Sequence, residues 1–275
     1  MIVGRFLGQL LRFAWQQARS CVFAVGVFVL LAVSTVVPLP IARYDALLLG
    51  CLALTAVLWL TGVETRREVL VICVFHAVGL ALELFKIRMG SWSYPEQALT
   101  KVAGVPLYSG FMYAAVGSYI CAAWRNLQLR LVNYRAVLTA LAATAVYLNF
   151  FTHHWLPDLR LLAAAGLIAA TWRTWVHYTV GGTEYRMPLA LSFGLIGMFL
   201  WIAENTATFL GAWRYPDQLD VWRMVHLSKL TSWTLLVSVS FVLAAAIRRS
   251  WTPGGAPGPH AVQDRRSAAA HWTRG

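Results

Sequence analysis

Long apolar runs recur along the whole of this 275-residue chain. A run of about 20 apolar residues can cross a bilayer as a helix, because a helix satisfies its backbone polar groups within the segment. The runs therefore predict an all-α integral membrane protein with eight transmembrane helices. The predicted helices cover residues 21–40, 45–62, 69–88, 104–124, 136–155, 161–178, 188–209 and 226–247.

The composition excludes a water-soluble globular domain. Apolar residues make up 59% of the chain and charged residues only 12%, whereas soluble domains carry about 25% charged residues. The net charge of +12 is scattered between apolar runs, which does not indicate a nucleic-acid partner. The four Cys lie in or at the end of apolar runs without C-x-x-C spacing, so the sequence predicts neither a disulfide framework nor a zinc site.

The positive charges orient the predicted helices. Most of the 23 Lys and Arg fall in segments on one side of the membrane, which places both termini inside. Residues 1–20, where Arg5, Arg12 and Arg19 are spaced by seven, predict an amphipathic segment on the membrane surface. Residues 250–275 are rich in Pro and Gly and predict a disordered tail.

One motif occurs twice, at a fixed offset of 121 residues. Residues 83–97 and 204–218 each contain a Glu followed by G-x-W-x-Y-P-[ED]-Q. A period this long is typical of a duplicated membrane bundle and not of a solenoid. We therefore predict two parallel four-helix repeats, residues 21–124 and 125–249, related by an axis near the membrane normal. Both motif copies are then expected at the outer face.

Each motif copy places a carboxylate in an apolar helix, about one turn from the outer end of that helix. A carboxylate is costly there and usually faces the bundle interior or a wet cavity, so Glu83 and Glu204 are candidate catalytic residues. Simpler interpretations remain open for both. Glu83 pairs with Lys86 in one of them, and Glu204 caps its neighbours through Asn205 in the other.

The aromatic residues of the motif are candidate substrate-binding residues. Interfacial belt residues are also common at such helix ends, but the fixed spacing from Gly and Pro favours a specific turn. We predict matching turns at the two Tyr-Pro pairs, since the residue before Pro is driven to an extended conformation. The four candidates are Trp92, Tyr94, Trp213 and Tyr215.

Three further polar residues are candidate substrate-binding residues. His76 precedes Glu83 by seven residues and shares its helix face, although a lone His in an apolar helix is commonly a packing residue. His226 and Lys229 share a helix face just after the second motif copy, where they are expected to line an outer cavity.

Two other polar patterns have structural interpretations. The side chains of His153 and His154 diverge on a helix and cannot easily bind one ion, so no metal and no cofactor is predicted. A G-x-E-x-R pattern occurs at residues 62–66 and 182–186. There, an acid at a helix start and a loop Arg predict a structural clamp at the inner end of each half.

Longer segments resemble an uncharacterised bacterial integral membrane family. GSWSYPEQ, GVPLYSGFMYAAVGSY, NFFTHHW and AENTATFLGAWRYPDQ are similar to the YoaT-like family, a domain of unknown function. The resemblance covers roughly residues 45–248. It implies a multi-pass protein of the bacterial inner membrane and brings no activity with it.

Part of the motif is also similar to membrane carotenoid enzymes, namely the heterodimeric lycopene cyclases and the carotenoid hydratases. That similarity implies protonation of a polyene by a carboxylic acid within the membrane. The chain departs from the cyclases at residues 106–109, where Pro-Leu-Tyr-Ser replaces Pro-x-Glu-Glu, so cyclisation is not expected. The residues that carry the similarity are Glu83, Gly90, Trp92, Tyr94 and Pro106, with Glu204, Gly211, Trp213 and Tyr215 in the second copy.

Three functions are compatible with these patterns. In an acid/base enzyme acting on an isoprenoid or another apolar lipid, Glu83 and Glu204 form a pair of which one is protonated. In a small-solute transporter, the repeat carries a polar solute past the same residues. In a non-catalytic lipid-binding protein they support a filled core. Membrane lipids and an apolar isoprenoid are the expected partners, and the sequence does not determine the oligomeric state.

Overall fold

A computed structural model describes residues 2–250 of the chain. The predicted tail over residues 250–275 falls outside the described residues, except for Ser250. The described residues up to Ala244 form one compact unit, whereas residues 245–250, the end of the last helix, belong to a second unit.

The described residues form nine α-helices, five short strands and two 3₁₀ turns. The helices are α1 (Ile2–Ser20), α2 (Val22–Val36), α3 (Arg43–Leu60), α4 (Arg66–Arg88), α5 (Gly110–Asn126), α6 (Ala136–Thr152), α7 (Arg160–Thr171), α8 (Leu189–Phe209) and α9 (Ser228–Ser250). The strands are β1 (Lys101–Val102), β2 (Val105–Pro106), β3 (Arg130–Val132), β4 (Trp175–Val180) and β5 (Thr183–Pro188). The 3₁₀ turns are η1 (Leu107–Ser109) and η2 (Pro216–Gln218).

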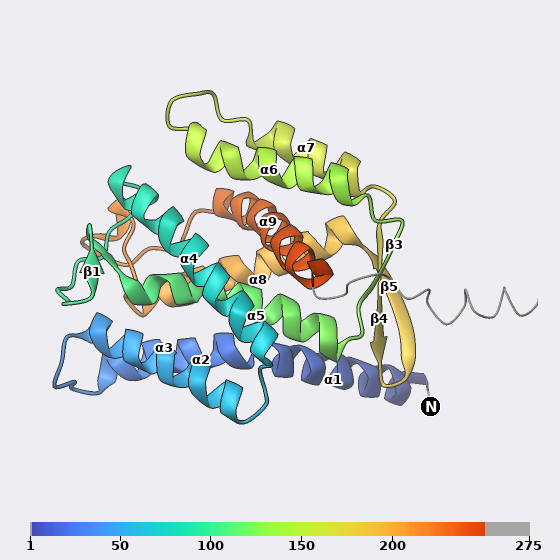
Figure 1. Cartoon of the computed structure of the whole chain (residues 1–275), viewed down its shortest axis with the longest axis horizontal. Coiled ribbons are helices and arrows are strands. Elements are labelled where there is room, and N and C mark those ends of the chain that lie inside the picture. Colours follow the sequence, from blue (N-terminus) through green and yellow to red (C-terminus); the bar gives the residue numbers. More distant parts are fainter. Residues whose placement is uncertain (1, 251–275) are drawn as a thin grey trace, which may run out of the picture. The chain divides into compact units, whose positions relative to one another are not determined.

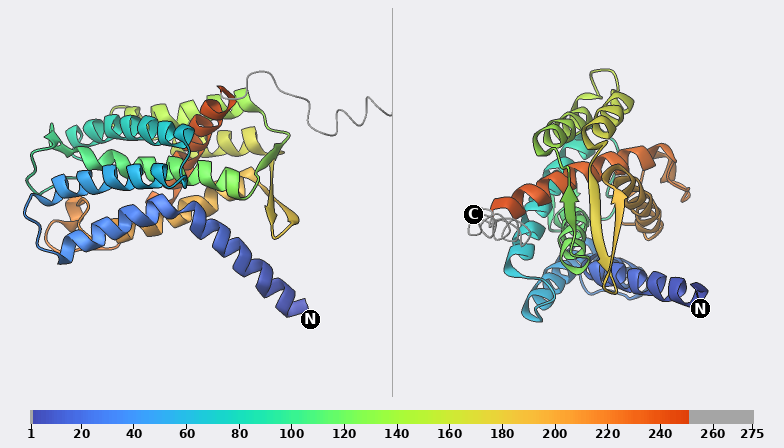
Figure 2. Two further views of the ribbon diagram at one scale, coloured as in Figure 1. Left: turned by 60° about the horizontal axis from the view of Figure 1, so that its bottom comes forward. Right: turned by 90° about the vertical axis from the view of Figure 1, so that its right-hand side faces the viewer.

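Helices α2 to α9 run alternately between two ends of the bundle (Figures 1 and 2). The motif end consists of the loops over residues 37–42, 89–109, 153–159 and 210–227. The opposite end consists of residues 61–65, 127–135 and 172–188. Hydrogen bonds join the loops within each end. Arg43 Nη2 donates to the Leu210 carbonyl (2.6 Å) at the motif end, and Arg125 Nη2 donates to the Val63 carbonyl (2.9 Å) at the opposite end.

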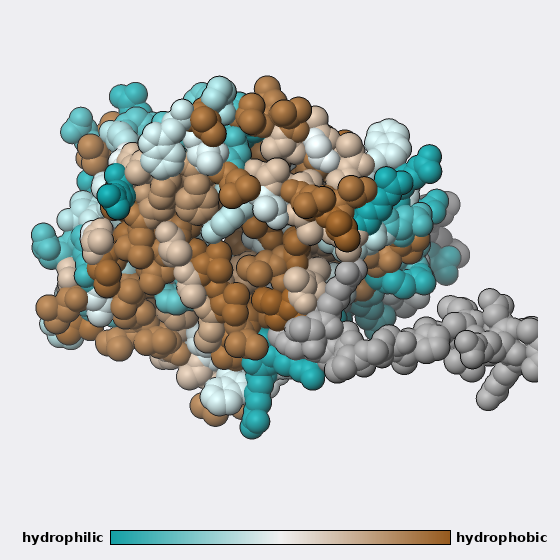
Figure 3. All heavy atoms as spheres, turned by 45° about the horizontal axis from the view of Figure 1, so that its top comes forward, coloured by the Kyte–Doolittle hydropathy of each residue, from teal (hydrophilic) through white to brown (hydrophobic). Residues whose placement is uncertain are grey.

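The prediction of a helical membrane protein is confirmed, but eight spans are not. Among the described residues, four helices are long and apolar enough to cross a membrane, namely α3, α4, α8 and α9. Helices α1 and α2 together are also long and apolar enough to form a fifth span, which is bent by 66° between them. Helices α6 and α7 are apolar but shorter. Figure 3 shows hydrophobic side chains over the middle of one face and hydrophilic ones toward its two ends.

The predicted helix over residues 161–178 is wrong in its second half. Helix α7 ends at Thr171, and β4 pairs antiparallel with β5 through a two-residue turn. The turn residues Gly181 and Gly182 have φ of +55° and +80°, which glycine adopts without strain. The aromatic and β-branched residues of β4 fit a pleated surface better than a helix. Hydropathy alone does not separate these two structures.

Close packing of α4 on α5 fixes the centre of the bundle. A Cβ atom on Gly79 of α4 would lie 2.5 Å from the Tyr113 ring, and one on Gly117 of α5 would lie 2.7 Å from the Phe75 ring. These glycines therefore let the two helices approach closely, as small residues do in membrane bundles. The predicted helix over residues 104–124 begins only at Gly110, because the β1–β2 hairpin occupies the residues before it.

The predicted amphipathic segment is helix α1, which meets α2 at a sharp bend. Figure 2 shows the N-terminal part of α1 projecting away from the other helices, whereas its C-terminal part contacts the end of α5, where Gln16 Nε2 donates to the Asn126 carbonyl at 3.2 Å. Phe6, Leu11 and Trp15 are each more than 60% exposed on it. That pattern fits a helix lying in the membrane interface, and the surface location remains a prediction.

Candidate functional site

Helices α4 and α8 end in the same way at the two motif copies. Gly90 and Gly211 follow the last turns with φ of +67° and +69°. The Ser91 N–H donates to the Lys86 carbonyl (3.0 Å), and the Ala212 N–H makes the equivalent bond to the Ala207 carbonyl (2.9 Å). These are Schellman caps, in which a glycine in the left-handed region reverses the chain. The two helices therefore end in the same way, upstream of the Tyr-Pro pairs.

The two copies diverge after their tyrosines. Tyr215 is extended, as expected before a proline, and a 3₁₀ turn over Pro216–Gln218 follows it. No helical turn follows Tyr94. The prediction of matching turns at the two Tyr-Pro pairs is therefore wrong, because only the second pair begins a 3₁₀ turn.

The two motif copies contact each other directly at equivalent positions. The Ser93 N–H donates to the Arg214 carbonyl and the Arg214 N–H donates to the Ser93 carbonyl, both at 2.9 Å. The Trp92 and Tyr215 rings meet edge to face, with centroids 6.0 Å apart. Both copies therefore reach the same end of the bundle, as predicted. The division into two superposable four-helix halves, residues 21–124 and 125–249, stays a prediction.

Glu83 accepts three hydrogen bonds from aromatic side chains. Its Oε2 accepts from Trp92 Nε1 (2.8 Å) and from the Tyr94 hydroxyl (2.9 Å), and its Oε1 accepts from the Tyr113 hydroxyl (2.7 Å). The side chain is 3% exposed. The alternative pairing with Lys86 is not found, because the Lys86 ammonium donates to the Phe150 carbonyl at 2.7 Å.

Glu204 has a similar but not identical environment. Its Oε1 accepts from the Tyr215 hydroxyl (2.5 Å) and its Oε2 from Trp233 Nε1 of α9 (2.7 Å). In both copies the tyrosine eleven positions after the glutamate donates to it. The indole donor differs, because Trp92 of the first motif copy donates to Glu83, whereas Trp233 of α9 donates to Glu204. The alternative interpretation through Asn205 is not found, because its amide donates to the Trp201 carbonyl and accepts from the Val225 N–H.

Both glutamates line one cavity of about 190 Å³ at the motif end. Helices α4 to α9 all contribute to its wall. The predicted site residues that the structure brings to this cavity are Glu83, Trp92, Glu204, Trp213, Tyr215 and Lys229. Tyr94 does not line the cavity itself but donates a hydrogen bond to Glu83, which does.

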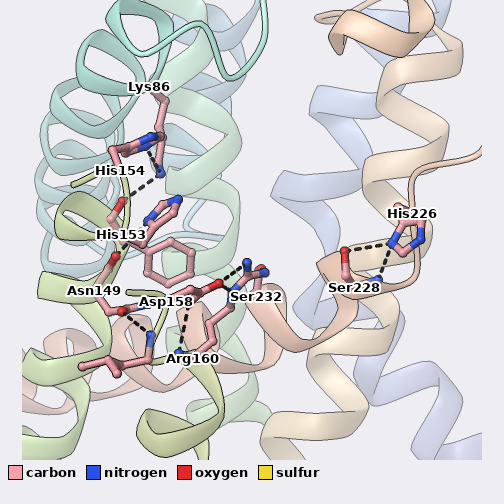
Figure 4. Close-up of polar contacts among 11 residues, drawn as sticks. Lys86, Asn149, His153, His154, Asp158, Arg160, His226, Ser228 and Ser232 are labelled. Carbon is pink, nitrogen blue, oxygen red and sulfur yellow. Dashed lines mark hydrogen bonds and ion pairs between the residues drawn. The ribbon is translucent and has the colours of Figure 1, made fainter. Parts of the chain in front are cut away.

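Two predicted binding residues lie elsewhere. His76 packs between α4 and α5, with its ring 4.4 Å from that of Phe111, and its Nδ1 has no hydrogen-bond partner among the described residues. His226 is exposed and its ring nitrogen bonds to Ser228 (Figure 4). Neither is among the residues that line the cavity. Helical spacing placed both of them on a face but could not reveal which neighbour would cover that face.

Of the three cations that line the cavity, only Lys229 was predicted from the sequence. Lys86 and Arg160 line it together with Lys229. Arg160 donates to the Asp158 carboxylate through Nε (2.7 Å) and to Ser232 through Nη1 (3.1 Å). Figure 4 shows Lys86, His154, Asp158 and Arg160 in one polar region, away from His226. A signal was present for Lys86 alone, as a lysine close to an intramembrane glutamate.

Asp158 holds Arg160 at the rim of the cavity. The Arg160 guanidinium keeps the pKa of this carboxyl well below its usual range, mainly by hydrogen bonding. No group of three His, Cys, Asp or Glu within residues 2–250 could hold a metal ion. The absence of a cofactor stays a prediction.

The predicted clamps at the opposite end take a different form. Glu64 accepts from the Ser118 hydroxyl (2.5 Å), while Glu68 pairs with Arg125 (2.9 Å) and caps the start of α4. Glu184 pairs with Arg130 at 2.8 Å. The acids of both G-x-E-x-R copies thus have structural partners, but those partners are not the motif's own arginines.

Glu64 makes the stability of the protein depend on pH. Burial raises the pKa of this loop carboxyl from 4.5 to about 7, so the folded state binds a proton that the unfolded state releases. The stabilisation is full below about pH 4.5 and is lost as the pH rises to about 7, by about 3 kcal/mol. We expect the melting temperature in neutral detergent to fall over this pH interval.

A Glu64→Gln variant should remove most of this pH dependence, because glutamine does not titrate. Exposed Asp220 offers a matched carboxylate in the other half of the chain, and Asp220→Asn should retain it. An unchanged pH profile in Glu64→Gln would contradict the assignment.

The comparisons with known proteins place the chain among proteins of unknown function. Residues 9–241 match the model of a family described as "Protein of unknown function (DUF817)". An uncharacterized protein, YoaT, from Bacillus subtilis (strain 168) is 53% identical over 247 residues, which are 89% of this chain and 94% of that protein. No solved structure matches. The similarity to carotenoid enzymes finds no support in these matches.

Proposed function

The chain belongs to the DUF817 family, and we propose that it is a multi-pass protein of the bacterial inner membrane that binds a membrane amphiphile in the cavity at its motif end. The single observation that carries the proposal is the convergence of both motif copies on one cavity. Glu83 and Glu204 come from helices distant in sequence, yet they line the same space together with aromatic side chains. A cavity with mostly apolar walls and a few placed polar groups is typical of small-molecule sites.

The size of the cavity limits what it encloses. Its volume of about 190 Å³ exceeds the engineered cavity of about 150 Å³ that holds benzene. It is smaller than the roughly 300–1,000 Å³ of sites that enclose a drug-sized ligand. The volume therefore suits a headgroup or a short chain segment and not a whole isoprenoid, so that the remainder of an amphiphile would lie among the surrounding lipids.

The hydrogen bonds of the two glutamates support an anchoring role in a binding site. An indole N–H is only a donor, so Trp92 and Trp233 require an acceptor at the glutamate oxygens they contact. Tyr94 and Tyr113 occupy two more of the lone pairs of Glu83. Glu83 and Glu204 then act as anchors that orient the aromatic wall of the cavity.

The charge distribution supports an outward-facing cavity. Of the 18 Lys and Arg up to residue 244, ten lie on α1 or at the opposite end and eight lie at the motif end, and the side with more positive charge is typically the cytoplasmic side. The ten are Arg5, Arg12, Arg19, Arg66, Arg67, Arg125, Arg130, Arg135, Arg173 and Arg186. We therefore place the motif end with its cavity at the outer face of the membrane, which is the orientation predicted from the sequence.

Filling the cavity tests the proposal. A Met112→Trp variant places an indole in the cavity wall, whereas Met198 is 40% exposed on α8 and lies outside the wall. Met198→Trp is therefore the matched control. We expect mass spectrometry of the purified protein to detect a bound amphiphile in the wild type and in Met198→Trp, and only background in Met112→Trp. Equal amounts in both variants, or none in the wild type, would contradict the proposal.

A further inference from the structure

The Lys229 ammonium faces the cavity without a hydrogen-bonding partner among the described residues. Its Nζ lies 4.6 Å from the centroid of the Tyr215 ring and 5.8 Å from that of the Trp92 ring. Aromatic faces stabilise a cation by their quadrupole but leave all three of its N–H groups unused. Lys229 is thus held in place by two rings with its donors available.

The second lysine of the cavity is bound only to neutral groups. The Lys86 ammonium donates to the Phe150 carbonyl (2.7 Å) and contacts His154 Nε2 at 3.2 Å. Its residue is 6% exposed, and no described acid forms an ion pair with it at 4 Å or less. A buried ammonium without a counter-ion is costly.

The positive charges of the cavity repel one another. Lys86 lies within electrostatic range of Lys229 and Arg160, which repel it, and of Asp158, which attracts it less strongly. Asp158 neutralises Arg160 through an ion pair, which leaves the charges of the two lysines. Like charges brought together in a low-dielectric site raise the free energy of the empty cavity, and an anion between them would lower it.

The glutamates of the cavity do not supply that anion. Glu204 is close enough to attract Lys229, but its oxygens bind Tyr215 and Trp233. The oxygens of Glu83 are bound by three aromatic donors. The unused hydrogen-bonding groups of the two lysines are donors, so a ligand that fits them must bring acceptors.

We propose that Lys86 and Lys229 bind the phosphate group of a membrane amphiphile, of the phosphate-monoester class. This inference rests on the proposed function and names its ligand class. Two ammonium groups match the charge of a phosphate dianion, and the phosphate oxygens supply acceptors for the donors of Lys229 and for the remaining donor of Lys86. The alkyl part of the ligand would extend along the apolar wall of the cavity, which includes Leu82, Val116 and Leu236.

Three probes in neutral detergent test the inference. They are dodecyl phosphate, the uncharged monododecyl glycerol ether, and inorganic phosphate, each titrated while the intrinsic tryptophan fluorescence is recorded. Trp92, Trp213 and Trp233 line the cavity and report occupancy. We expect dodecyl phosphate to bind at least about tenfold more tightly than the uncharged ether, because charge-assisted hydrogen bonds are stronger than neutral ones.

Variants of Lys229 identify the group that binds the phosphate. Lys229→Met keeps an unbranched side chain over Tyr215 and should weaken dodecyl phosphate binding about tenfold or more, whereas Lys229→Arg should retain most of it. Lys86→Met should act in the same direction. Arg88 is exposed on the same helix as Lys86 and outside the cavity wall, so Arg88→Met is the control and should bind like the wild type.

The other outcomes overturn distinct parts of the argument. If the uncharged ether binds as well as dodecyl phosphate and Lys229→Met has no effect, the phosphate inference is wrong while the amphiphile proposal stands. If inorganic phosphate competes as strongly as dodecyl phosphate, the ligand is the free anion and not a lipid. If no probe binds, the proposed function itself fails.

Discussion

Replacing Glu83 by Ala is expected to destabilise the fold by about 3 kcal/mol or more, the largest effect of any single change at the site. The substitution leaves the donors of Trp92, Tyr94 and Tyr113 buried without their acceptor. Each buried donor that loses its partner costs about 1–3 kcal/mol. Unfolding in mixed neutral and denaturing detergent measures the difference from the wild type.

The Glu83→Gln variant is the matched control and should remain close to wild-type stability. Trp92 and Tyr94 both bond to Oε2, which the amide oxygen can replace. The amide nitrogen then takes the place of Oε1 and donates to the Tyr113 hydroxyl, because a tyrosine hydroxyl also accepts. Equal stability of the Ala and Gln variants would contradict the anchoring role.

The same pair of variants separates binding from proton chemistry. Gln retains the hydrogen bonds but carries no acidic proton. If Glu83 only anchors the aromatic wall, Glu83→Gln should bind dodecyl phosphate like the wild type. An acid/base role predicts instead a folded variant whose activity falls about a hundredfold to ten-thousandfold. The Tyr215 and Trp233 bonds of Glu204 permit the same test with Glu204→Gln.

Replacing Gly197 by Ala is expected to destabilise the packing of α8 against α9 by about 1–3 kcal/mol. A Cβ atom there would overlap Thr234 Oγ1 and would lie 2.7 Å from the Thr234 backbone nitrogen. Backbone cannot move aside as a side-chain end can, so α9 has to shift. Since Trp233 precedes Thr234, the shift should also weaken its bond to Glu204.

Gly194 provides the control on the same helix. A Cβ atom at Gly194 meets nothing within 4 Å, so Gly194→Ala should be neutral or stabilise the helix by up to about 1 kcal/mol. Detergent unfolding of the two variants measures the contrast, and the tryptophan response to dodecyl phosphate reports the effect on the cavity. A Gly197→Ala variant as stable as Gly194→Ala would show that α8 and α9 are not in close contact at this position.

Local features of the sequence determined the ends of α4 and α8. A glycine followed two and four positions later by Trp and Tyr recurs at residues 90 and 211, and both glycines adopt the left-handed conformation that a Schellman cap needs. Hydropathy determined the membrane class for a similar reason, because it depends on the composition of single segments. Both properties are local, so they can be predicted from a single sequence without an alignment.

Hydropathy was insufficient where different structures share one composition. The residues of β4 are apolar enough to continue a helix, yet they pair with β5 across Gly181 and Gly182. The number of membrane spans was overestimated for the same reason. Helices α6 and α7 are apolar, but each is shorter than the helices that are long enough to cross a membrane, such as α4. Segment length and pairing depend on contacts with the rest of the chain.

The sequence by itself determined that Glu83 and Glu204 occupy equivalent positions near helix ends with a Trp and a Tyr nearby. Only the tertiary structure decided that they share a cavity, that Trp233 and not Trp213 donates to Glu204, and that His76 lies outside the cavity. It also decided that Lys86 and Lys229 face one space. The physical reason is that helical periodicity fixes the face on which a side chain lies, whereas the packing of helices distant in sequence fixes what that face meets.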